Sequence, residues 1–247
     1  MSASRYFVFI PAAGIGVRVG SCIPKQYMPL FGQPMLMHIL KTFIEITIIS
    51  HIFVVVRPTD EYIADLLSAA PQLHRKVTVL FHGGSSRRES VLNGLKMARE
   101  QINDEDWILV HDAARPGLTC TLTEHLIHTL CTDPVGGLLA LPVVDTLKTC
   151  DTHMRTIQTI PNSRLWMAQT PQMFRYKLLL HALEISNSAT DEANAVEQLG
   201  LKPRLVEGSL YNLKVTLPND LALVENFLRE RHLNQLHLEE ISHEPKI

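Results

Sequence analysis

The sequence predicts an α/β fold built on a mostly parallel, twisted sheet with helices on both faces. Along the first 143 residues, apolar runs of strand length alternate with stretches of helical period. The first run, YFVFI at 6–10, is typical of a strand buried on both faces. Such regular alternation places successive strands in parallel. The composition, 46% hydrophobic and 19% charged over 247 residues, suits an ordinary globular protein.

Five strands and four helices are expected in this first part of the chain. The strands are the runs at 6–10, 51–56, 76–81, 107–111 and 136–143. The helices are the periodic stretches at 34–46, 59–70, 86–101 and 121–131. Thr59 or Asp60 is expected to cap the second helix, and the spacing of Ser86 and Glu89 predicts a capping box at the start of the third.

The alternation breaks after residue 143, where a threonine-rich stretch has no helical period. We predict a β-hairpin arm at about 143–170 that protrudes from a single domain spanning 1–247. A long hairpin is marginally stable alone, so it should pack on something, and a partner subunit is a plausible surface. Beyond it we expect helices at 174–186 and 191–199, strands within 203–216, and a terminal helix at 218–236.

Charge and cysteine content narrow the classes of function. The net charge of -2 gives no global field that favours nucleic acid or an anionic membrane, so any anion site must be built locally. The cysteines are Cys22, Cys120, Cys131 and Cys150, and no two form a C-x-x-C pair. We therefore expect reduced thiols in a cytoplasmic protein, with no signal peptide and no membrane span.

Ligands of parallel α/β sheets bind beyond the carboxyl ends of the strands. That rule selects three segments of this chain, 11–33, 82–90 and 112–117. The first contains Gly14 and Gly16, which match the first two glycines of the dinucleotide fingerprint. The third position of that pattern is Val19, and no acidic residue precedes Glu45 in the whole chain. A dehydrogenase needs a carboxylate near the end of its second strand, about 20 residues past the glycines, and none stands there. The Walker pattern also fails, because no G-K-[ST] follows.

The same glycine segment carries Arg18 and Lys25. Free backbone N–H groups, two cations and no acid favour a phosphate site over a tight structural turn with solvated basic residues. Past the fourth strand, Asp112 is placed to hold a Mg²⁺ ion that bridges phosphates, and Arg115 to brace the loop or the substrate. The plainer alternative is an aspartate that caps the next turn.

The second segment, around 82–90, has two interpretations. Gly84, Ser85 and Ser90 could read the edge of a base, or SSRRES could only begin a helix, which the spacing alone favours. Two further chemistries are not indicated. His125 and His128 lack the H-E-x-x-H order of a zinc protease, and no G-x-S-x-G elbow marks a serine nucleophile.

Seven motifs together resemble one enzyme family. They are PAAGIGVRVGSCIPKQYMPLFGQPMLMH, HGGSSRRESVLNGL, LVHDAARP, PVVDTLK, LWMAQTPQMF, TDEA and NLKVT. In this order they resemble the 2-C-methyl-D-erythritol 4-phosphate cytidylyltransferases, from about Phe7 to Leu228. The resemblance implies a three-layer, Rossmann-like nucleotidyltransferase fold whose hairpin is a dimerisation arm. It also implies a Mg²⁺-dependent transfer of CMP from CTP to methylerythritol phosphate, in a homodimer.

The resemblance also assigns roles to residues. Arg18 and Lys25 would contact the triphosphate and stabilise the transition state, with Lys214 as a third catalytic cation. Asp112 would lie near Mg²⁺, the ribose and the alcohol. CTP would further be bound by the residues of two loops, Pro11, Ala12, Ala13, Gly14, Gly16, Gly84, Ser85 and Ser90. The alcohol phosphate would be bound by residues beyond these loops, Arg115, Thr146, Arg164 and Thr170, with Thr146 reaching the other subunit.

One position departs from the family pattern. An arginine usually precedes S-x-L-W, but this chain has Asn162 there and an arginine two residues later, Arg164. Residues two apart on a strand share a face, so we expect Arg164 to substitute. Three alternative functions remain open at this point. They are a cytidylyltransferase for another polyol phosphate such as ribitol 5-phosphate, a nucleotide-binding regulator without activity, and a dehydrogenase.

Overall fold

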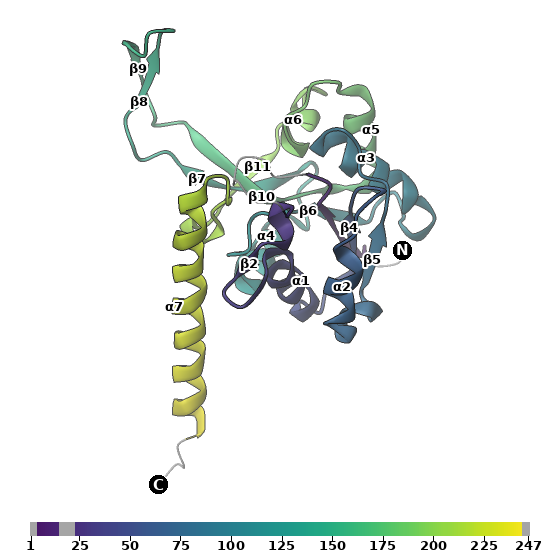
Figure 1. Ribbon diagram of the computed structural model, residues 1–247. Coiled ribbons are helices and arrows are strands. Elements are labelled where there is room, and N and C mark those ends of the chain that lie inside the picture. The colour runs from purple at the N-terminus through teal and green to yellow at the C-terminus, as the bar shows by residue number, and fades with distance from the viewer. Residues whose placement is uncertain (1–3, 15–22, 244–247) are drawn as a thin grey trace.

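A seven-stranded sheet forms the centre of the computed structural model, which describes residues 4–14 and 23–243, with side chains to residue 234. The strand order is β11-β7-β10-β6-β1-β4-β5 (Figure 1). In chain order these strands are β1 (Tyr6–Pro11), β4 (Ile49–Val55), β5 (Val77–Leu80), β6 (Trp107–Val110), β7 (Gly136–Pro142), β10 (Trp166–Arg175) and β11 (Arg204–Glu207). All neighbours pair in parallel except β10, which is antiparallel to both β6 and β7. The predicted mostly parallel sheet is confirmed.

Helices cover both faces of this sheet, as predicted. One face packs on α1 (Met35–Glu45), α2 (Ile63–Ser68) and α4 (Cys120–Leu130), and the other on α3 (Arg87–Met97), α5 (Tyr176–Ile185) and α6 (Glu192–Glu197). Figure 1 shows the second group above the sheet and the first below it. Residues of β1 divide between the faces with the period of two that a strand imposes, Val8 and Ile10 on one and Phe7 and Phe9 on the other.

Of the predicted helix caps, Ser86 caps α3 as expected, whereas the start of α2 differs from the prediction. The hydroxyl of Ser86 accepts a hydrogen bond from the N–H of Glu89 (3.1 Å), but the Glu89 carboxylate turns to the N–H of Ser85 (2.7 Å). Oδ1 of Asp60 accepts from the N–H of Ile63, the first residue of α2, at 3.0 Å, but the N-cap position is Tyr62, whose side chain makes no cap bond. Helix α2 is also shorter at both ends than the predicted 59–70. At its carboxyl end, Pro71 begins a separate turn, η3 (Pro71–Arg75), and a residue before a proline is disfavoured in a helix.

Strand β10 is the main difference from the sequence-based expectation. We predicted an arm to about residue 170 and a helix from 174, yet the chain runs as a strand in the middle of the sheet up to Arg175. Pro171 and its polar neighbours argue against an interior strand. The structure accommodates them because the pairing of β10 with β7 is irregular between Ala168 and Gln172. Similarly, within 203–216 only β11 is a strand, followed by a short turn of helix, η5 (Leu210–Asn212).

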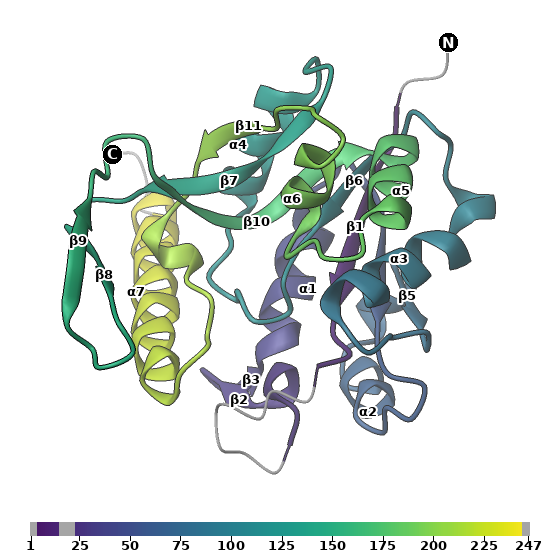
Figure 2. The same cartoon turned by 90° about the horizontal axis from the view of Figure 1, so that it is seen from above.

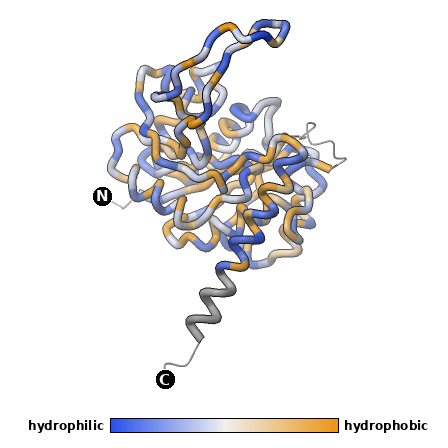
Figure 3. Tube along the Cα trace, turned by 90° about the vertical axis from the view of Figure 1, so that its left-hand side faces the viewer, coloured by the Kyte–Doolittle hydropathy of each residue, from blue (hydrophilic) through white to orange (hydrophobic). Residues whose placement is uncertain are grey.

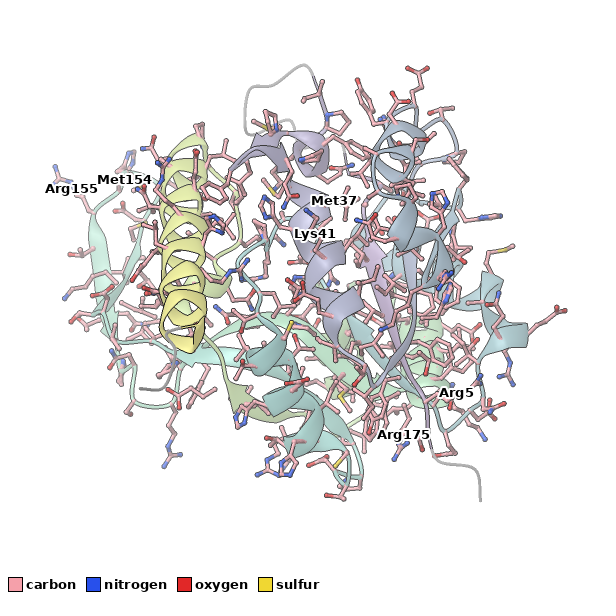
Figure 4. All side chains as sticks on the ribbon, turned by 90° about the horizontal axis from the view of Figure 1, so that it is seen from below. Arg5, Met37, Lys41, Met154, Arg155 and Arg175 are labelled. Atoms are coloured by element: carbon pink, nitrogen blue, oxygen red, sulfur yellow. The ribbon has the colours of Figure 1, made fainter. Side chains whose placement is uncertain are left out.

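Two segments extend from this body. Strands β8 (Leu147–Cys150) and β9 (Thr156–Ile160) form a separate antiparallel pair that stands clear of the main sheet (Figure 3). Figure 4 shows Met154 and Arg155 at the outer end of this pair. Apolar side chains are exposed at the turn of this pair and on the chain that leads to it, among them Met154 (81%) and Val144 (83%).

The terminal helix, α7 (Pro218–His243), lies on the same side of the molecule as this hairpin (Figures 1 and 2). It packs on the body through Val224 and Leu228, which join a small cluster with Leu30 and Met35. The cluster also includes Val215, the valine of the NLKVT segment. Within the described residues, no helix combines the length and apolarity needed to cross a membrane.

Three short elements connect the glycine segment to α1. They are η2 (Lys25–Tyr27), β2 (Pro29–Leu30) and β3 (Gln33–Pro34). A further turn, η4 (Arg99–Gln101), follows α3. At the amino-terminal edge of the sheet, Arg5 pairs with Asp106 (2.6 Å) and Arg175 stacks over Trp107, and Figure 4 shows the two arginines near one another. The ligand edge is the opposite one.

Candidate active site

The carboxyl ends of four parallel strands, β1, β4, β5 and β6, meet at one edge of the sheet. Because β10 is antiparallel and Gln172 pairs with Val110 at the end of β6, the residues before Gln172 lie beyond that same edge. The N–H of Asp112 accordingly donates to the hydroxyl of Thr170 at 3.0 Å. Segments far apart in sequence are thus joined here.

A pocket of about 460 Å³ lies at this edge. Its lining contains ten of the predicted site residues, Pro11, Ala12, Ala13, Gly14, Lys25, Gly84, Ser85, Ser90, Asp112 and Lys214. Four predicted residues do not line it, namely Arg115, Thr146, Arg164 and Thr170. Gly16 and Arg18 lie outside the described residues.

Asp112 is the buried centre of the charges around this pocket. One carboxylate oxygen accepts from Nε of Arg87 (2.8 Å), and the other lies 2.9 Å from Nζ of Lys214 and 3.5 Å from Nε of Arg115. Burial alone would raise the pKa of Asp112, but the charges of Arg87 and Lys214 outweigh it and hold the pKa below its usual range. Asp112 therefore stays ionised at neutral pH.

Sequence reasoning missed a second layer behind this carboxylate. The two Nη atoms of Arg87 donate to the two oxygens of Glu192 at 2.7 and 2.9 Å, and Glu192 is fully buried. Arg87 thereby joins Asp112 to the start of α6. The signal was present, since Arg87 lies in SSRRES and Glu192 in TDEA, but no spacing rule connects residues 105 apart in sequence.

Lys25 and Lys214 come to the pocket from opposite ends of the chain. Lys25 is the first residue of η2, directly after Pro24. Its Nζ donates to the carbonyl of Val215, next to Lys214, at 2.5 Å. The neighbouring Gln26 side chain donates to the carbonyl of Ala12 at 2.6 Å, which holds η2 against the start of the glycine segment. The two predicted cations therefore face one pocket.

The segment after β5 serves the helix cap and the pocket wall at once. The hydroxyl of Ser90 accepts from the N–H of Gly84 (3.0 Å) and donates to the carbonyl of Ser86 (2.9 Å). A Cβ added at Gly83 would lie 2.3 Å from Cβ of Ala13, so glycine there lets the two loops touch. The predicted helix cap is confirmed, and contact with a base edge stays a prediction.

Arg115 braces the site rather than facing the pocket. It is 8% exposed, and its guanidinium donates to the carbonyls of Asn212 (2.8 Å) and Ala168 (3.3 Å). These bonds tie the loop after β6 to β10 and to η5. Of the two roles considered for Arg115, the structure displays the bracing of the loop.

His111, fully buried beside Asp112, has a protonation state that its partners define. Burial lowers the pKa of His111 to about 4, so the ring is neutral at pH 7. A carbonyl only accepts, so Nε2, 3.1 Å from the carbonyl of Arg115, carries the proton. Nδ1 then accepts from the hydroxyl of Thr170 (3.0 Å), which in turn accepts from the N–H of Asp112.

This neutral histidine predicts a loss of stability on mild acidification. The unfolded chain takes up a proton near pH 6.5 and the folded chain only near pH 4, so stability falls as the pH drops between these values. Between pH 7.5 and 5, we expect His111 to account for a loss of about 2 kcal/mol in the free energy of unfolding. Urea unfolding of the wild type and of His111→Gln at both pH values measures this difference. Equal pH dependence in the two proteins would refute it.

The expectation that Arg164 shares a strand face with position 162, and so replaces the arginine usual there, is wrong in its geometry. Residues 162–165 form a turn between β9 and β10, closed by the N–H of Leu165 donating to the carbonyl of Asn162 (2.9 Å). The shared-face rule for strands therefore does not apply. Arg164 is exposed on this turn, and its contact with a phosphate stays a prediction.

Asn162 has a structural task of its own. Its Nδ2 atom lies 3.1 Å from the carbonyl of Val143 and 3.0 Å from that of Asp145, so one amide bridges the two legs of the hairpin where it leaves the body. We expect Asn162→Ala to speed amide hydrogen exchange over 143–165 by about tenfold, the worth of one to two hydrogen bonds. Ser163→Ala, at the exposed neighbour, is the control. Unchanged exchange in Asn162→Ala would remove this role.

The oxygen ligands that line the pocket fit Mg²⁺ only if the substrate phosphates supply further ligands. Among the residues described, no group of three or more His, Cys, Asp or Glu side chains converges as a metal site. Asp112 is the one carboxylate on the described pocket lining. Mg²⁺ is commonly bound through one or two carboxylates together with substrate phosphates and water. The residues therefore fit a magnesium ion that arrives with the nucleotide.

Fold and site together define a class of protein. The sheet is mostly parallel, and the pocket at its carboxyl edge holds several cations beside a single carboxylate on the described lining. These features are typical of a nucleotide-binding α/β enzyme that handles phosphoryl groups. The family model "IspD: 2-C-methyl-D-erythritol 4-phosphate cytidylyltransferase" matches residues 6–230, and the chain belongs to this family of nucleotidyltransferases.

Individual relatives agree with the family model. The chain is 52% identical over 231 residues to the 2-C-methyl-D-erythritol 4-phosphate cytidylyltransferase of Nitrosomonas eutropha, covering 92% of this chain and 98% of the relative. It is 47% identical to that of Aromatoleum aromaticum, covering 92% and 97%. A crystal structure of 4-diphosphocytidyl-2C-methyl-D-erythritol synthase superposes with a TM-score of 0.80 at 38% identity, covering 91% and 98%. The Francisella tularensis enzyme superposes with 0.76 at 33% identity, covering 91% and 100%.

Proposed function

We propose that this protein transfers CMP from CTP to 2-C-methyl-D-erythritol 4-phosphate. The products are 4-diphosphocytidyl-2-C-methyl-D-erythritol and pyrophosphate, in isoprenoid precursor biosynthesis. The convergence of Lys25, Lys214 and Asp112 on one pocket, in a chain of this family, carries the proposal. The pocket lining holds the cations Lys25, Arg57, Arg87 and Lys214 and the anion Asp112, so positive charge prevails where a triphosphate would bind.

The reaction needs little proton transfer. A phosphate oxygen of the alcohol substrate attacks the α-phosphorus of CTP in line, forming a new P–O bond. The bond from the α-phosphorus to the oxygen that bridges it to the β-phosphorus breaks, and pyrophosphate leaves with those electrons. The nucleophile is already an anion, so catalysis requires alignment and neutralisation of charge rather than a base or a covalent intermediate.

Lys25 and Lys214 supply much of that charge. We assign them to the triphosphate and the incoming phosphate, and Asp112 holds Lys214 in place through its 2.9 Å ion pair. The contact of Lys25 with the carbonyl of Val215 keeps both amines at one side of the pocket. Arg18 keeps its assignment as a third clamp on the triphosphate, at a position outside the described residues.

Asp112 would hold Mg²⁺ together with the phosphates of CTP. The bound ion supplies charge neutralisation across the phosphate oxygens. The carboxylate is kept ionised and oriented by Arg87, so this chain presents an acceptor in the form that magnesium requires.

We further propose a homodimer formed through the hairpin. Its exposed apolar side chains, such as Val144 and Ile157, need cover, and a two-stranded sheet alone is marginal in water. Thr146 and Arg164 lie on its exposed surface, where they could reach the alcohol in a second subunit. Arg115 and Thr170 would act on the alcohol side by holding the loop that carries Asp112.

Pyrophosphate release with CTP and each of two polyol phosphates tests this proposal. We expect turnover with methylerythritol phosphate and a kcat/KM at least 100-fold lower with ribitol 5-phosphate. The reverse preference would overturn the assignment of substrate. Ribitol 5-phosphate is not favoured, because the main observation in its support was Asn162, and Asn162 has a structural role in the hairpin.

A further inference from the structure

Arg57 is a pocket residue to which neither the sequence motifs nor the chemistry above gives a task. It lies two residues past the end of β4, and β4 lies between β1 and β5 in the sheet. The backbone around it is held from both sides. The N–H of Ala12 donates to the carbonyl of Val55, and the N–H of Gly83 to that of Val56, both at 2.8 Å. Arg57 is therefore anchored between the two loops that are expected to hold CTP.

The other pocket cations are already engaged by the protein. Arg87 pairs with Asp112 and Glu192, and Lys214 pairs with Asp112. Lys25 donates to the carbonyl of Val215. The carboxylates thus neutralise part of the positive charge of Arg87 and Lys214, and the carbonyl occupies a donor of Lys25, before any substrate binds.

Arg57 differs from them. It is half-buried, and in the part of the chain that the structure describes its Nε atom is buried without a hydrogen-bond partner. No carboxylate of the described residues lies within 4.0 Å of its guanidinium. The Oδ1 atom of Asp60, three residues on, is occupied by the hydroxyl of Tyr27 (2.9 Å) and by backbone N–H groups.

The planar guanidinium of an arginine that lines a pocket with an unused donor fits an acceptor with several anionic oxygens, such as a phosphate. The position of β4 in the sheet indicates which of the two substrates carries the phosphate that Arg57 would contact. Strands β1 and β6 lie between β4 and β10, so Arg57 is on the side of CTP and away from Thr170 and the hairpin.

We propose that Arg57 binds anionic oxygens of the triphosphate of CTP, as a further substrate-binding residue of this enzyme. The inference rests on the proposed function, since it takes CTP as the ligand of the pocket. A bidentate contact of this kind would make Arg57 contribute mainly to the affinity for the nucleotide. It would leave the affinity for the alcohol phosphate largely unchanged.

Calorimetric titration of CTP and of inorganic tripolyphosphate tests this role in the wild type, Arg57→Ala, Arg57→Lys and Arg75→Ala. Arg75→Ala removes the same charge at an exposed position outside the pocket. We expect Arg57→Ala to weaken both ligands by about ten- to a hundredfold, the range for hydrogen bonds to charged groups. Arg57→Lys should recover part of this loss and Arg75→Ala should show none. In steady-state assays, the KM for CTP should rise in Arg57→Ala and the KM for the alcohol phosphate should stay within about threefold.

Two results would overturn the proposal. If CTP binding weakens while tripolyphosphate binding is unchanged, Arg57 contacts the base or ribose. If neither dissociation constant changes and only the melting temperature falls, Arg57 serves the fold, through Asp60, whose Oδ2 is also buried without a partner. Failure of the wild type itself to bind CTP would refute the proposed function instead, so the two failures are distinguishable.

Discussion

Replacing Lys25 with alanine is expected to lower kcat by at least about 100-fold while CTP still binds within about tenfold of the wild-type affinity. The amine lies at the pocket beside Lys214 and is assigned to charge that develops on the leaving pyrophosphate. An interaction that strengthens in the transition state affects kcat more than the ground-state binding of the nucleotide.

Single-turnover rates and CTP titrations of the same variant measure this prediction. The matched control is Lys41→Ala, which removes the same charge from an exposed position on α1, outside this pocket (Figure 4). A Lys25→Ala enzyme that turns over within about threefold of the wild type would show that Lys25 is not a catalytic residue. Loss of CTP binding in step with activity would reduce its role to nucleotide affinity.

Replacing Asp112 with asparagine is expected to cost both stability and activity. The change keeps the shape of the side chain and removes the anion that pairs with Arg87 and Lys214. Breaking a buried ion pair from one side costs about 3–5 kcal/mol. Because Lys214 is 42% exposed and Arg87 keeps Glu192, we expect the lower end, about 3 kcal/mol, in the free energy of unfolding.

Urea unfolding of Asp112→Asn against Glu61→Gln checks the stability part, since Glu61 is exposed and the change in charge is the same. We expect kcat to fall by at least about 100-fold in Asp112→Asn under conditions where the variant stays folded. If the Asp112→Asn protein is as stable as the control, the ion pairs with Arg87 and Lys214 contribute nothing net to the fold. Wild-type turnover in that variant would separate Asp112 from the chemistry.

The sheet and its ligand edge could be predicted because they depend on local signals. Apolar runs set the strands, and the rule for parallel sheets placed Gly14, Gly84 and Asp112 together before any contact was known. Lys25 could be assigned to a phosphate site from the cations and glycines of its own segment, whereas Lys214 could be assigned only through the family resemblance. No local pattern links Lys25 to the carbonyl of Val215, which lies 190 residues on and next to Lys214, although the two form a hydrogen bond.

The parts that were missed depend on long-range packing. Strand β10 carries Pro171 and polar residues that locally indicate a loop, and it is a strand because the interior of the sheet offers two partners. Arg87 looked like an ordinary charged residue at a helix start. Its significance appears only when α6 brings Glu192 within 2.7 Å. The role of Asn162 likewise follows from the carbonyls that it bridges.

The fate of two labelled phosphates of CTP shows whether this pocket carries out cytidylyl transfer. The protein is incubated with methylerythritol phosphate and with CTP labelled either at the α- or at the γ-phosphorus. We expect the α-label in the alcohol product and the γ-label in pyrophosphate. Transfer of the γ-label to the alcohol would indicate a kinase, and both labels remaining in CTP would indicate a nucleotide-binding protein without this activity. Either result would contradict the assignment of this pocket as a cytidylyltransferase site.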